Sequence, residues 1–328
     1  MSLLSGSSIL ITGGTGSLGK ALTKELLEHH GVNRLIIFSR DELKQLECRR
    51  MFNDDSRLRW FIGDVRDKDR LQRAFHKVDY VIHAAALKQV DTAEYNPFEF
   101  VKTNVQGSQN VIDAAIDSGV KKVVALSTDK ASSPVNLYGA TKLCADRLFI
   151  SGNHYAAAYD TRFCVVRYGN VMGSRGSIVP IWAKLAEAGE SLPITDNRMT
   201  RFWITIDQAA KFVLDSFEMM QGGELYVPKI PSVRISELAQ AVDPNAKTHE
   251  IGIRPGEKLH EEMIAADDSR RTVSVGDRYI VMPHVAGWGY EKPKNAEAVK
   301  DGWSYQSDGN EVFLTVPKLQ DMISAEGF

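Results

Sequence analysis

A glycine-rich turn near the N-terminus restricts the fold of this chain more than any other feature. The apolar segment Ser8–Thr12 is typical of a buried parallel strand, and a helical pattern runs from Lys20 to His30. A strand, a glycine-rich turn and a helix in this order form the context of a dinucleotide fingerprint, because small residues let the backbone approach a pyrophosphate. We therefore predict cofactor contacts from Gly13, Thr15, Gly16, Ser17, Leu18 and Gly19.

The end of the second predicted strand, at 34–38, bears on the kind of dinucleotide. It leads into Ser39 and Arg40, and Lys44 follows one helical turn later. An NAD site usually carries an acid at this point, whereas an arginine accommodates the 2′-phosphate of NADP. Asp41 is adjacent and Arg40 could instead cap the next helix, so both cofactors stay open. The two cations favour NADP, with contacts from Ser39, Arg40 and Lys44.

Further apolar segments alternate with helical patterns at 58–62, 78–86, 122–127 and 163–168. Such alternation predicts an α/β fold with a doubly wound parallel sheet of the Rossmann type, in which ligands bind at the carboxyl ends of the strands. At these ends we expect Asp64 and Val65 to contact the adenine, unless Asp64 caps a helix. Ala84 and Ala86 should let the backbone pass close to the nicotinamide ribose.

Tyr138 and Lys142 stand four residues apart, and therefore share one face of a helix. An ammonium beside the phenol would lower the pKa of Tyr138 from about 10. A phenolate near neutral pH can take a proton from a substrate hydroxyl while a nicotinamide takes the hydride. A helical Tyr and Lys without a catalytic role would be the better interpretation only if the glycine-rich turn were absent.

Beyond Gly169 the pattern changes, and we predict two interleaved domains, 1–169 for the cofactor and 170–328 predominantly for the substrate. The second contains predicted helices at 206–220 and 235–242, a short strand at 224–228, and loops rich in arginine. Arginine suits the bidentate binding of a diphosphate, although any one of them could serve as surface charge. As a group they favour a nucleotide-sugar, with Glu257 available for its ribose: Arg175, Arg198, Arg201 and Arg254.

Composition excludes several other classes of protein. The 328 residues are 43% hydrophobic and 25% charged, which is typical of a soluble chain with a large core. A net charge of −2 does not favour nucleic acid or a membrane surface, and no segment approaches a membrane span. Cys48, Cys144 and Cys164 are isolated, which predicts small core residues in a reducing cytoplasm, with no disulfide and no metal site.

Several runs resemble the extended branch of the short-chain dehydrogenase/reductase family, which contains the nucleotide-sugar epimerases and dehydratases. Within it, residues from about 8 to 265 are similar to the configuration-inverting UDP-N-acetylglucosamine 4,6-dehydratases. One loop departs from that pattern, with Gln89 and Asp91 where those enzymes usually have His and Pro, while Lys88 is kept. The runs that carry the resemblance are Ser39–Lys44, Gly63–Asp67, Ala93–Pro97, Ser127–Lys130, Asn136–Lys142 and Arg198–Trp203.

The resemblance implies a reaction and a role for each site residue. Tyr138 would take the C4 hydroxyl proton, Lys130 would be the base at C5, and Asp129 the acid at C6. Retaining relatives have Asp-Glu where this chain has Asp129-Lys130. A lysine can be that base only if its pKa falls from about 10.4. Thr128 would form a hydrogen bond with the C4 oxygen, and the alternative is a hydroxyl at the strand end with no catalytic role. For Asp129 and Lys130 the alternative is a surface ion pair.

The resemblance also implies ligands and further contacts. NADP would stay bound and be regenerated in each cycle, and UDP-N-acetylglucosamine would be the substrate of a cytoplasmic homo-oligomer, either a dimer or a hexamer built from dimers. The reaction would begin pseudaminic acid synthesis. Lys88, Asn104 and Val171 would contact the cofactor, with Tyr138 and Lys142. The substrate contacts would include Lys88, Lys130, Tyr138, Asn170, Gly176 and Thr195.

Two other functions fit the same residues less well. A UDP-hexosamine epimerase needs only the Tyr138–Lys142 couple, and neither it nor a retaining dehydratase explains Lys130. A regulatory protein with a dead catalytic site would need no intact couple. The detection of a 6-deoxy-4-keto product separates a dehydratase from an epimerase. Turnover of any UDP-sugar excludes the regulatory protein.

Overall fold

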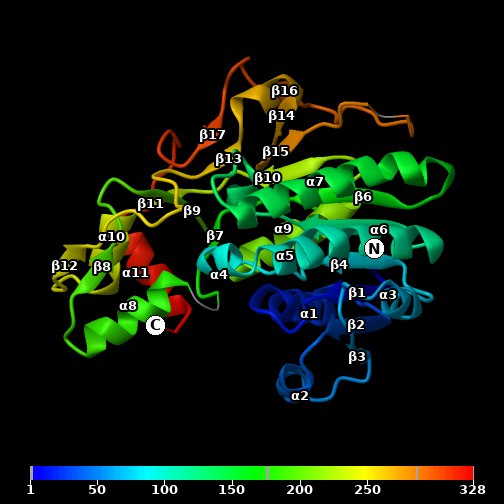
Figure 1. Cartoon of the computed structure of the whole chain (residues 1–328), viewed down its shortest axis with the longest axis horizontal. Coiled ribbons are helices and arrows are strands. Elements are labelled where there is room, and N and C mark those ends of the chain that lie inside the picture. The colour runs from blue at the N-terminus through cyan, green and yellow to red at the C-terminus, as the bar shows by residue number, and fades with distance from the viewer. Residues whose placement is uncertain (1–2, 175–176, 286, 328) are drawn as a thin grey trace.

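A ten-stranded sheet forms the centre of the computed structural model, which describes residues 3–174, 177–285 and 287–327 (Figure 1). Its strand order is β16-β14-β15-β10-β6-β5-β4-β1-β2-β3. The strands from β3 to β10 are parallel, and the remaining strands form an antiparallel edge. The strands are β1 (Ser8–Thr12), β2 (Arg34–Ser39), β3 (Leu58–Ile62), β4 (Tyr80–His83), β5 (Lys122–Leu126), β6 (Arg162–Val166), β10 (Leu225–Pro228), β14 (Thr272–Val275), β15 (Arg278–Val281) and β16 (Glu297–Ala298).

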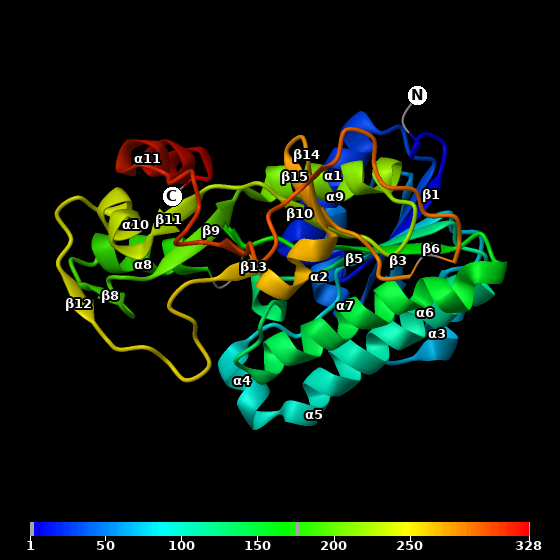
Figure 2. The same cartoon turned by 90° about the horizontal axis from the view of Figure 1, so that it is seen from above.

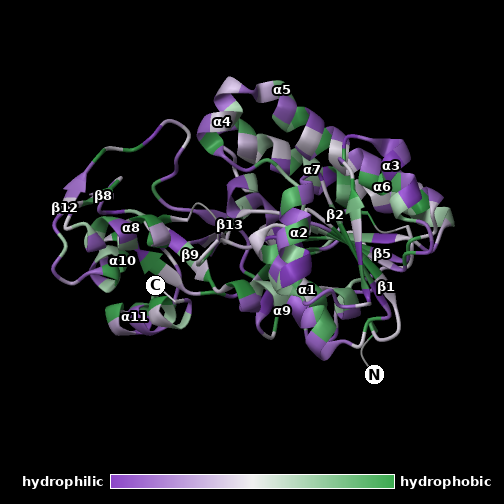
Figure 3. Ribbon diagram, turned by 90° about the horizontal axis from the view of Figure 1, so that it is seen from below, coloured by the Kyte–Doolittle hydropathy of each residue, from purple (hydrophilic) through white to green (hydrophobic). Residues whose placement is uncertain are grey.

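Helices cover both faces of this sheet, so its inner strands are almost wholly apolar (Figures 2 and 3). One face carries α1 (Ser17–His29) and α9 (Ile206–Met219), which pack together. The other carries α3 (Lys68–Ala74), α6 (Gly107–Asp117) and α7 (Leu137–Tyr155). The strand order reverses between β1 and β4, which is where doubly wound folds bind their ligands. The predicted α/β fold with a doubly wound sheet is therefore confirmed.

The segments around β4 differ in detail from the prediction. The strand expected at 78–86 ends at His83, after which the chain leaves the sheet and forms a loop. Two short helices follow, α4 (Val90–Tyr95) and α5 (Pro97–Phe100). A π-helical segment, η1 (Val101–Gln106), comes next, and α6 begins at Gly107. α2 (Glu42–Met51) connects β2 to β3.

A second apolar core lies beside the large sheet, at the left of Figure 1. Trp182, Trp203, Leu238 and Leu319 are buried in it. Its helices are α8 (Ile178–Glu187), α10 (Ile235–Val242) and the C-terminal α11 (Val316–Ala325). Its strands are β7 (Asn170–Val171), β8 (Leu192–Ile194), β9 (Thr200–Ile204), β11 (Ser232–Arg234) and β12 (Thr248–Glu250).

Some segments predicted for the smaller domain lie in the large sheet instead. α9 packs on α1, and β10 pairs with β6. The tail, which the sequence left unassigned, adds the antiparallel edge and the pair β13 (Glu262–Ile264) and β17 (Tyr305–Gln306). The chain therefore passes several times between the core of the large sheet and the second apolar core. The candidate site lies at these crossings.

Two observations bear on the compositional predictions. Cys48 and Cys164 are buried, but Cys144 is exposed on α7, so the prediction of three core cysteines is wrong for that one. None of the helices in the part of the chain described here is long and apolar enough to span a bilayer.

Candidate active site

The glycine-rich turn forms a cradle at the switch point of the sheet. Gly13 has a φ of +68°, and a Cβ on it would lie 2.8 Å from the Ala85 backbone nitrogen. A Cβ on Gly19 would overlap the backbone of Gly14. Only glycine can hold this close approach of turn, helix and β4 loop. The N-terminus of α1 follows Gly16, which provides no side-chain cap, so its N–H groups suit a pyrophosphate.

A cavity of about 850 Å³ runs from this cradle to the smaller core. Its lining contains nearly every residue predicted for the cofactor: Gly13, Thr15, Gly16, Ser17, Leu18, Gly19, Ser39, Arg40, Lys44, Asp64, Val65, Ala84, Ala86, Lys88, Tyr138, Lys142 and Val171. Asn104 is outside that lining. Its amide bonds both the N–H and the carbonyl of Leu87 at 2.9 Å and also Thr141, so it holds the loop after β4 in place.

The alternative roles of Arg40 and Asp64 as helix caps are wrong, because other residues cap the two helices. Asp41 caps α2, through a 3.0 Å bond from the Lys44 backbone nitrogen, and Asp67 caps α3. Arg40 lies 3.7 Å from Asp64 with about half its side chain exposed. Burial would raise the pKa of Asp64, but hydrogen bonds from Arg66 hold that pKa below its usual value. An accessible arginine therefore stands where a 2′-phosphate would lie.

The carboxyl end of β5 meets the start of α7 at the catalytic end of the cavity. Thr128 caps the short helix η2 (Asp129–Ala131), and its hydroxyl donates to Asp129 Oδ1 at 2.8 Å. Tyr138 is buried beside this turn. Burial raises the pKa of Tyr138 to about 12, although Lys130 and a hydrogen bond with Thr128 act in the opposite direction.

Lys142 lies four residues after Tyr138 on α7 and is buried like it. Its ammonium donates to the Leu126 carbonyl at 2.6 Å, and burial lowers the pKa of Lys142 itself. Lys130, on the neighbouring turn, acts by its charge to lower the pKa of Tyr138. The effect of Lys142 on the Tyr138 phenol stays a prediction.

Lys130 lies between two buried carboxylates. Its Nζ is 3.2 Å from Asp129 Oδ1 and 3.1 Å from Glu261 Oε1. Asp129 is 1% exposed and Glu261 2%, so the alternative of a surface ion pair is wrong. Burial alone would lower the pKa of Lys130, but the two carboxylates outweigh it and raise that pKa. The condition for a lysine base, a lowered pKa, is therefore not met by these contacts.

The predicted substrate residues divide into three groups. Those that line the large cavity are Lys88, Lys130, Tyr138, Asn170, Thr195, Arg201, Arg254 and Glu257. Arg198 is mostly exposed and binds Asp196 two residues away, at 2.7 Å and 3.0 Å, instead of lining the cavity. Arg175 and Gly176 lie outside the described residues.

Several buried polar atoms of the cavity-lining residues lack a hydrogen-bond partner among the described residues. Asn170 Oδ1 and Glu257 Oε2 are buried and accept no hydrogen bond from the described residues. Buried polar groups are normally satisfied in folded proteins. Their place in the wall therefore suits a polar ligand. Lys88 lies in the same wall, where burial and the charge of Lys130 lower its pKa.

The loop that departs from the related enzymes keeps a regular structure. Gln89 precedes α4 and gives it no side-chain cap, while Asp91 stands in its first turn. An acid at this place suits the helix dipole. Lys88, directly before Gln89, still lines the cavity.

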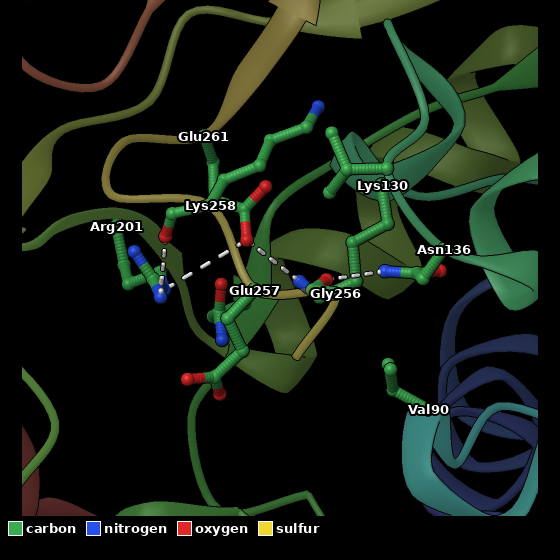
Figure 4. A pocket seen from close by; sticks show the side chains of 10 residues that line it. Val90, Lys130, Asn136, Arg201, Gly256, Glu257, Lys258 and Glu261 are labelled. Carbon is green, nitrogen blue, oxygen red and sulfur yellow. Dashed lines mark hydrogen bonds and ion pairs between the residues drawn. The ribbon is translucent and has the colours of Figure 1, made fainter. Parts of the chain in front are cut away.

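Some residues of the site were missed by the sequence interpretation. Glu261 ends the segment that supplied Arg254 and Glu257, yet only the structure shows it beside Lys130 (Figure 4). Asp146 is buried behind Lys142, where it accepts from Ser127 at 2.6 Å and from Arg167 at 2.8 Å. No local motif signals either carboxylate, because their partners lie on other elements.

Gly139 determines how closely Tyr138 approaches the Asp129–Lys130 turn. A Cβ at this position would overlap the Lys130 carbonyl oxygen and lie 3.1 Å from Pro134. Gly139→Ala should therefore displace η2, destabilise the fold by about 1–3 kcal/mol and slow catalysis. Thermal unfolding and a rate measurement on the same sample check this. Gly152→Ala on the same helix is the control, because its Cβ would meet only side chains at 3.2 Å or more and should cost little. Equal stability and activity in both variants would contradict the steric argument.

Comparisons with known proteins agree with this geometry. The polysaccharide biosynthesis protein family matches residues 9–283. A UDP-N-acetylglucosamine 4,6-dehydratase (inverting) from Campylobacter jejuni (strain 81-176) is 54% identical over 335 residues, which cover 99% of this chain and 100% of the relative. A UDP-glucose 4-epimerase from Rickettsia canadensis is 42% identical over 279 residues, which cover 83% of this chain and 82% of the relative.

Solved structures share the fold. Pen from Bacillus thuringiensis superposes with a TM-score of 0.91 and 37% identity, over 99% of both chains. DesIV, a dTDP-glucose 4,6-dehydratase from Streptomyces venezuelae with NAD bound, has a TM-score of 0.68 and 25% identity, over 77% of this chain and 86% of its own.

Proposed function

The chain belongs to the polysaccharide biosynthesis protein family, within the extended short-chain dehydrogenases/reductases, and on this premise we propose that it is an inverting UDP-N-acetylglucosamine 4,6-dehydratase. The observation that carries the proposal is the Asp129–Lys130 turn, which faces the same cavity as Tyr138. The relative of that name covers nearly the whole chain, and supports the choice of reaction. The product would be UDP-2-acetamido-2,6-dideoxy-β-L-arabino-hex-4-ulose, the starting compound of pseudaminic acid synthesis.

The chain's own groups account for each proton movement. The glycine-rich turn and the other cofactor residues of the cavity would hold a nicotinamide dinucleotide, which would supply the chemistry of hydride removal from C4 and hydride return to C6. Tyr138 takes the C4 hydroxyl proton, and Thr128 donates a hydrogen bond to the C4 oxygen as it becomes a ketone. Because C5–H is then α to a carbonyl, Lys130 can remove that proton while Asp129 protonates the departing C6 hydroxyl. Proton return to the opposite face of C5 gives inversion.

An epimerase is the second candidate, because the Rickettsia relative carries that name. An epimerase needs a base at C4 but no group at C5 or C6. Here the Asp129 carboxyl group is buried at a cost in desolvation and contacts Lys130 in the same cavity wall, and an epimerase would not need this arrangement. A retaining dehydratase would fit a carboxylate, and not an amine, at position 130.

Incubation with UDP-N-acetylglucosamine and NMR of the product tests the proposal. A 6-deoxy-4-keto sugar of L-arabino configuration supports it. UDP-N-acetylgalactosamine would establish the epimerase, and a D-xylo product the retaining enzyme. No turnover of any UDP-sugar would leave the regulatory interpretation. Size measurement of the same sample tests the predicted dimer or hexamer.

The cofactor is a nicotinamide dinucleotide, and we propose NADP. Arg40 and Lys44 lie at the edge of the cavity where a 2′-phosphate would bind, and β2 ends in Ser39 and not in an acid. The structural neighbour DesIV was solved with NAD bound. The choice of NADP over NAD for this chain therefore depends on Arg40 and Lys44. Lys44 also contacts Asp41 at 3.1 Å, which leaves Arg40 as the principal cation.

Arg40→Ala should weaken NADP binding and leave NAD binding nearly unchanged. The loss of one charge-assisted contact costs about 1.5–3 kcal/mol, or roughly tenfold to a hundredfold in Kd. Titration of the protein with each cofactor measures the two constants. Arg59→Ala, on the outer edge strand β3, is the control and should change neither. Equal weakening of NAD and NADP by Arg40→Ala would rule out the 2′-phosphate role.

A further inference from the structure

Glu261 is a buried carboxylate on the wall of the site that the proposed chemistry does not yet use. Its backbone is fixed from both sides, since Glu261 N donates to Ser307 Oγ at 2.9 Å and Ser307 N donates to the Glu261 carbonyl at 2.8 Å. One carboxylate oxygen, Oε1, lies 3.1 Å from Lys130 Nζ and 3.8 Å from Arg201 Nε (Figure 4). The side chain is thus held against the amine by a rigid backbone.

We propose that Glu261 accepts the proton of the Lys130 ammonium inside the closed site, which frees the Lys130 amine to remove the C5 proton. This rests on the proposed dehydratase function. An N–H bond of Lys130 breaks, an O–H bond forms on Glu261 Oε1, and the nitrogen keeps the electron pair. After Lys130 has taken the C5 proton it is an ammonium again, and Glu261 then loses its proton to water, which restores the starting carboxylate. C5 receives one solvent-derived proton on its opposite face, so the protons balance over the cycle.

The charges of the cluster favour this internal route. The cluster pairs two basic side chains, Lys130 and Arg201, with the carboxyl groups of Asp129 and Glu261. A proton that moves from Lys130 to Glu261 leaves the net charge of the cluster unchanged. A proton that leaves for solvent makes that charge more negative by one, which is costly beside two buried carboxyl groups. The pKa of Lys130 is raised by the same two carboxylates, so loss to solvent near neutral pH is rare.

Glu261 is better suited than Asp129 to take the proton. The proposed chemistry already requires Asp129 to hold a proton of its own, because Asp129 is the acid at C6. Glu261 has no other role in that chemistry, and its Oε1 lies 3.1 Å from the Lys130 amine. Its other oxygen, Oε2, is buried without a hydrogen bond from the described residues.

Other charged groups surround Lys130, and they do not replace Glu261. Lys88 and Tyr138 face it from the β4 loop and α7, and each is linked to it through charge. Lys258 belongs to the same loop as Glu261, but Figure 4 shows its side chain running away from the cavity. It donates to the Ser132 carbonyl instead. None of these groups is a carboxylate in contact with the Lys130 amine.

The test is the pH dependence of elimination in Glu261→Gln. In the wild type, the shared proton makes the C5 step nearly independent of pH across the neutral range. In the variant, Lys130 must lose its proton to solvent. Elimination should then fall by about 10²–10³-fold near neutral pH, and recover about tenfold for each pH unit toward the pKa of Lys130. Rapid mixing with UDP-N-acetylglucosamine should still show reduction of the bound cofactor, because that step precedes the base.

Two further variants keep the result interpretable. Glu261→Asp retains a carboxylate and should restore the flat profile at a lower rate. Glu262→Gln is the matched control, because Glu262 accepts from Ser132 and Ser133 on the same turn without contacting Lys130. Its profile should stay flat whatever its rate. A loss in Glu261→Gln that is uniform across pH, no loss, or a gain in rate would each overturn the proposal. A wild type that forms no 6-deoxy-4-keto product would instead reject the dehydratase function.

Discussion

Tyr138→Phe should reduce turnover by about 10²–10⁴-fold, because the change removes the group that takes the C4 hydroxyl proton. The ring stays, so its edge-on contact with Phe100 and its place in the cavity wall should persist. Cofactor should therefore remain bound in the purified variant. Steady-state rates with UDP-N-acetylglucosamine and the cofactor content measure the two effects.

Tyr80→Phe is the matched control for this prediction. Tyr80 is also buried, but it packs against Phe217 in the core of the sheet and lies outside the cavity lining. Loss of its hydroxyl should leave the rate within about tenfold. A Tyr138→Phe enzyme that works as fast as Tyr80→Phe would show that another group takes the C4 proton.

The pH dependence of the first step follows from the pKa of Tyr138. Because burial raises that pKa to about 12, the phenolate is scarce near neutral pH. Reduction of the bound cofactor should thus accelerate as the pH rises, until the pKa itself sets a limit. Since the charge of Lys130 lowers this pKa, removing Lys130 should shift the rise to higher pH.

Local patterns were sufficient to predict the fold and the cofactor half of the site. The turn from Gly13 to Gly19 and the pair of Tyr138 and Lys142 depend on residues that are close in sequence. Period, propensity and spacing act over such short distances. The ligand contacts at the strand ends could also be predicted, because parallel strands place their carboxyl ends at one edge of the sheet.

The remaining part depends on contacts that no local pattern contains. Glu261 is 131 residues from Lys130 in the sequence, and only the passage of the chain between the two cores brings them together. The raised pKa of Lys130 is a consequence of that meeting, whereas the sequence argument gave only the condition that this pKa must fall for Lys130 to act as a base. Arg198, predicted to contact the substrate, does not line the cavity for a different reason, because it binds the near neighbour Asp196. Composition does not show whether an arginine pairs with a near neighbour or faces a ligand.

Lys130→Ala should separate the two halves of the reaction. Hydride leaves C4 before Lys130 acts, so mixing with UDP-N-acetylglucosamine should still reduce the bound cofactor, seen by its near-ultraviolet absorbance. Elimination should then stall by about 10²–10⁴-fold, because the base at C5 is missing. Lys258→Ala is the control: it removes a nearby cation of the same charge whose side chain points away from the cavity, and product should still form.

Isotope and configuration at C5 complete this prediction. In heavy water the wild-type product should carry deuterium at C5, because the proton that Lys130 removes is lost and a solvent-derived one arrives at the opposite face. The same product should have the L-arabino configuration, since protonation from the other side inverts the centre. The 4-keto sugar that accumulates in Lys130→Ala should keep its original C5 hydrogen, because the base that removes this hydrogen is missing. Wild-type product with hydrogen at C5 and the D-xylo configuration would reject both the role of Lys130 and the inverting reaction.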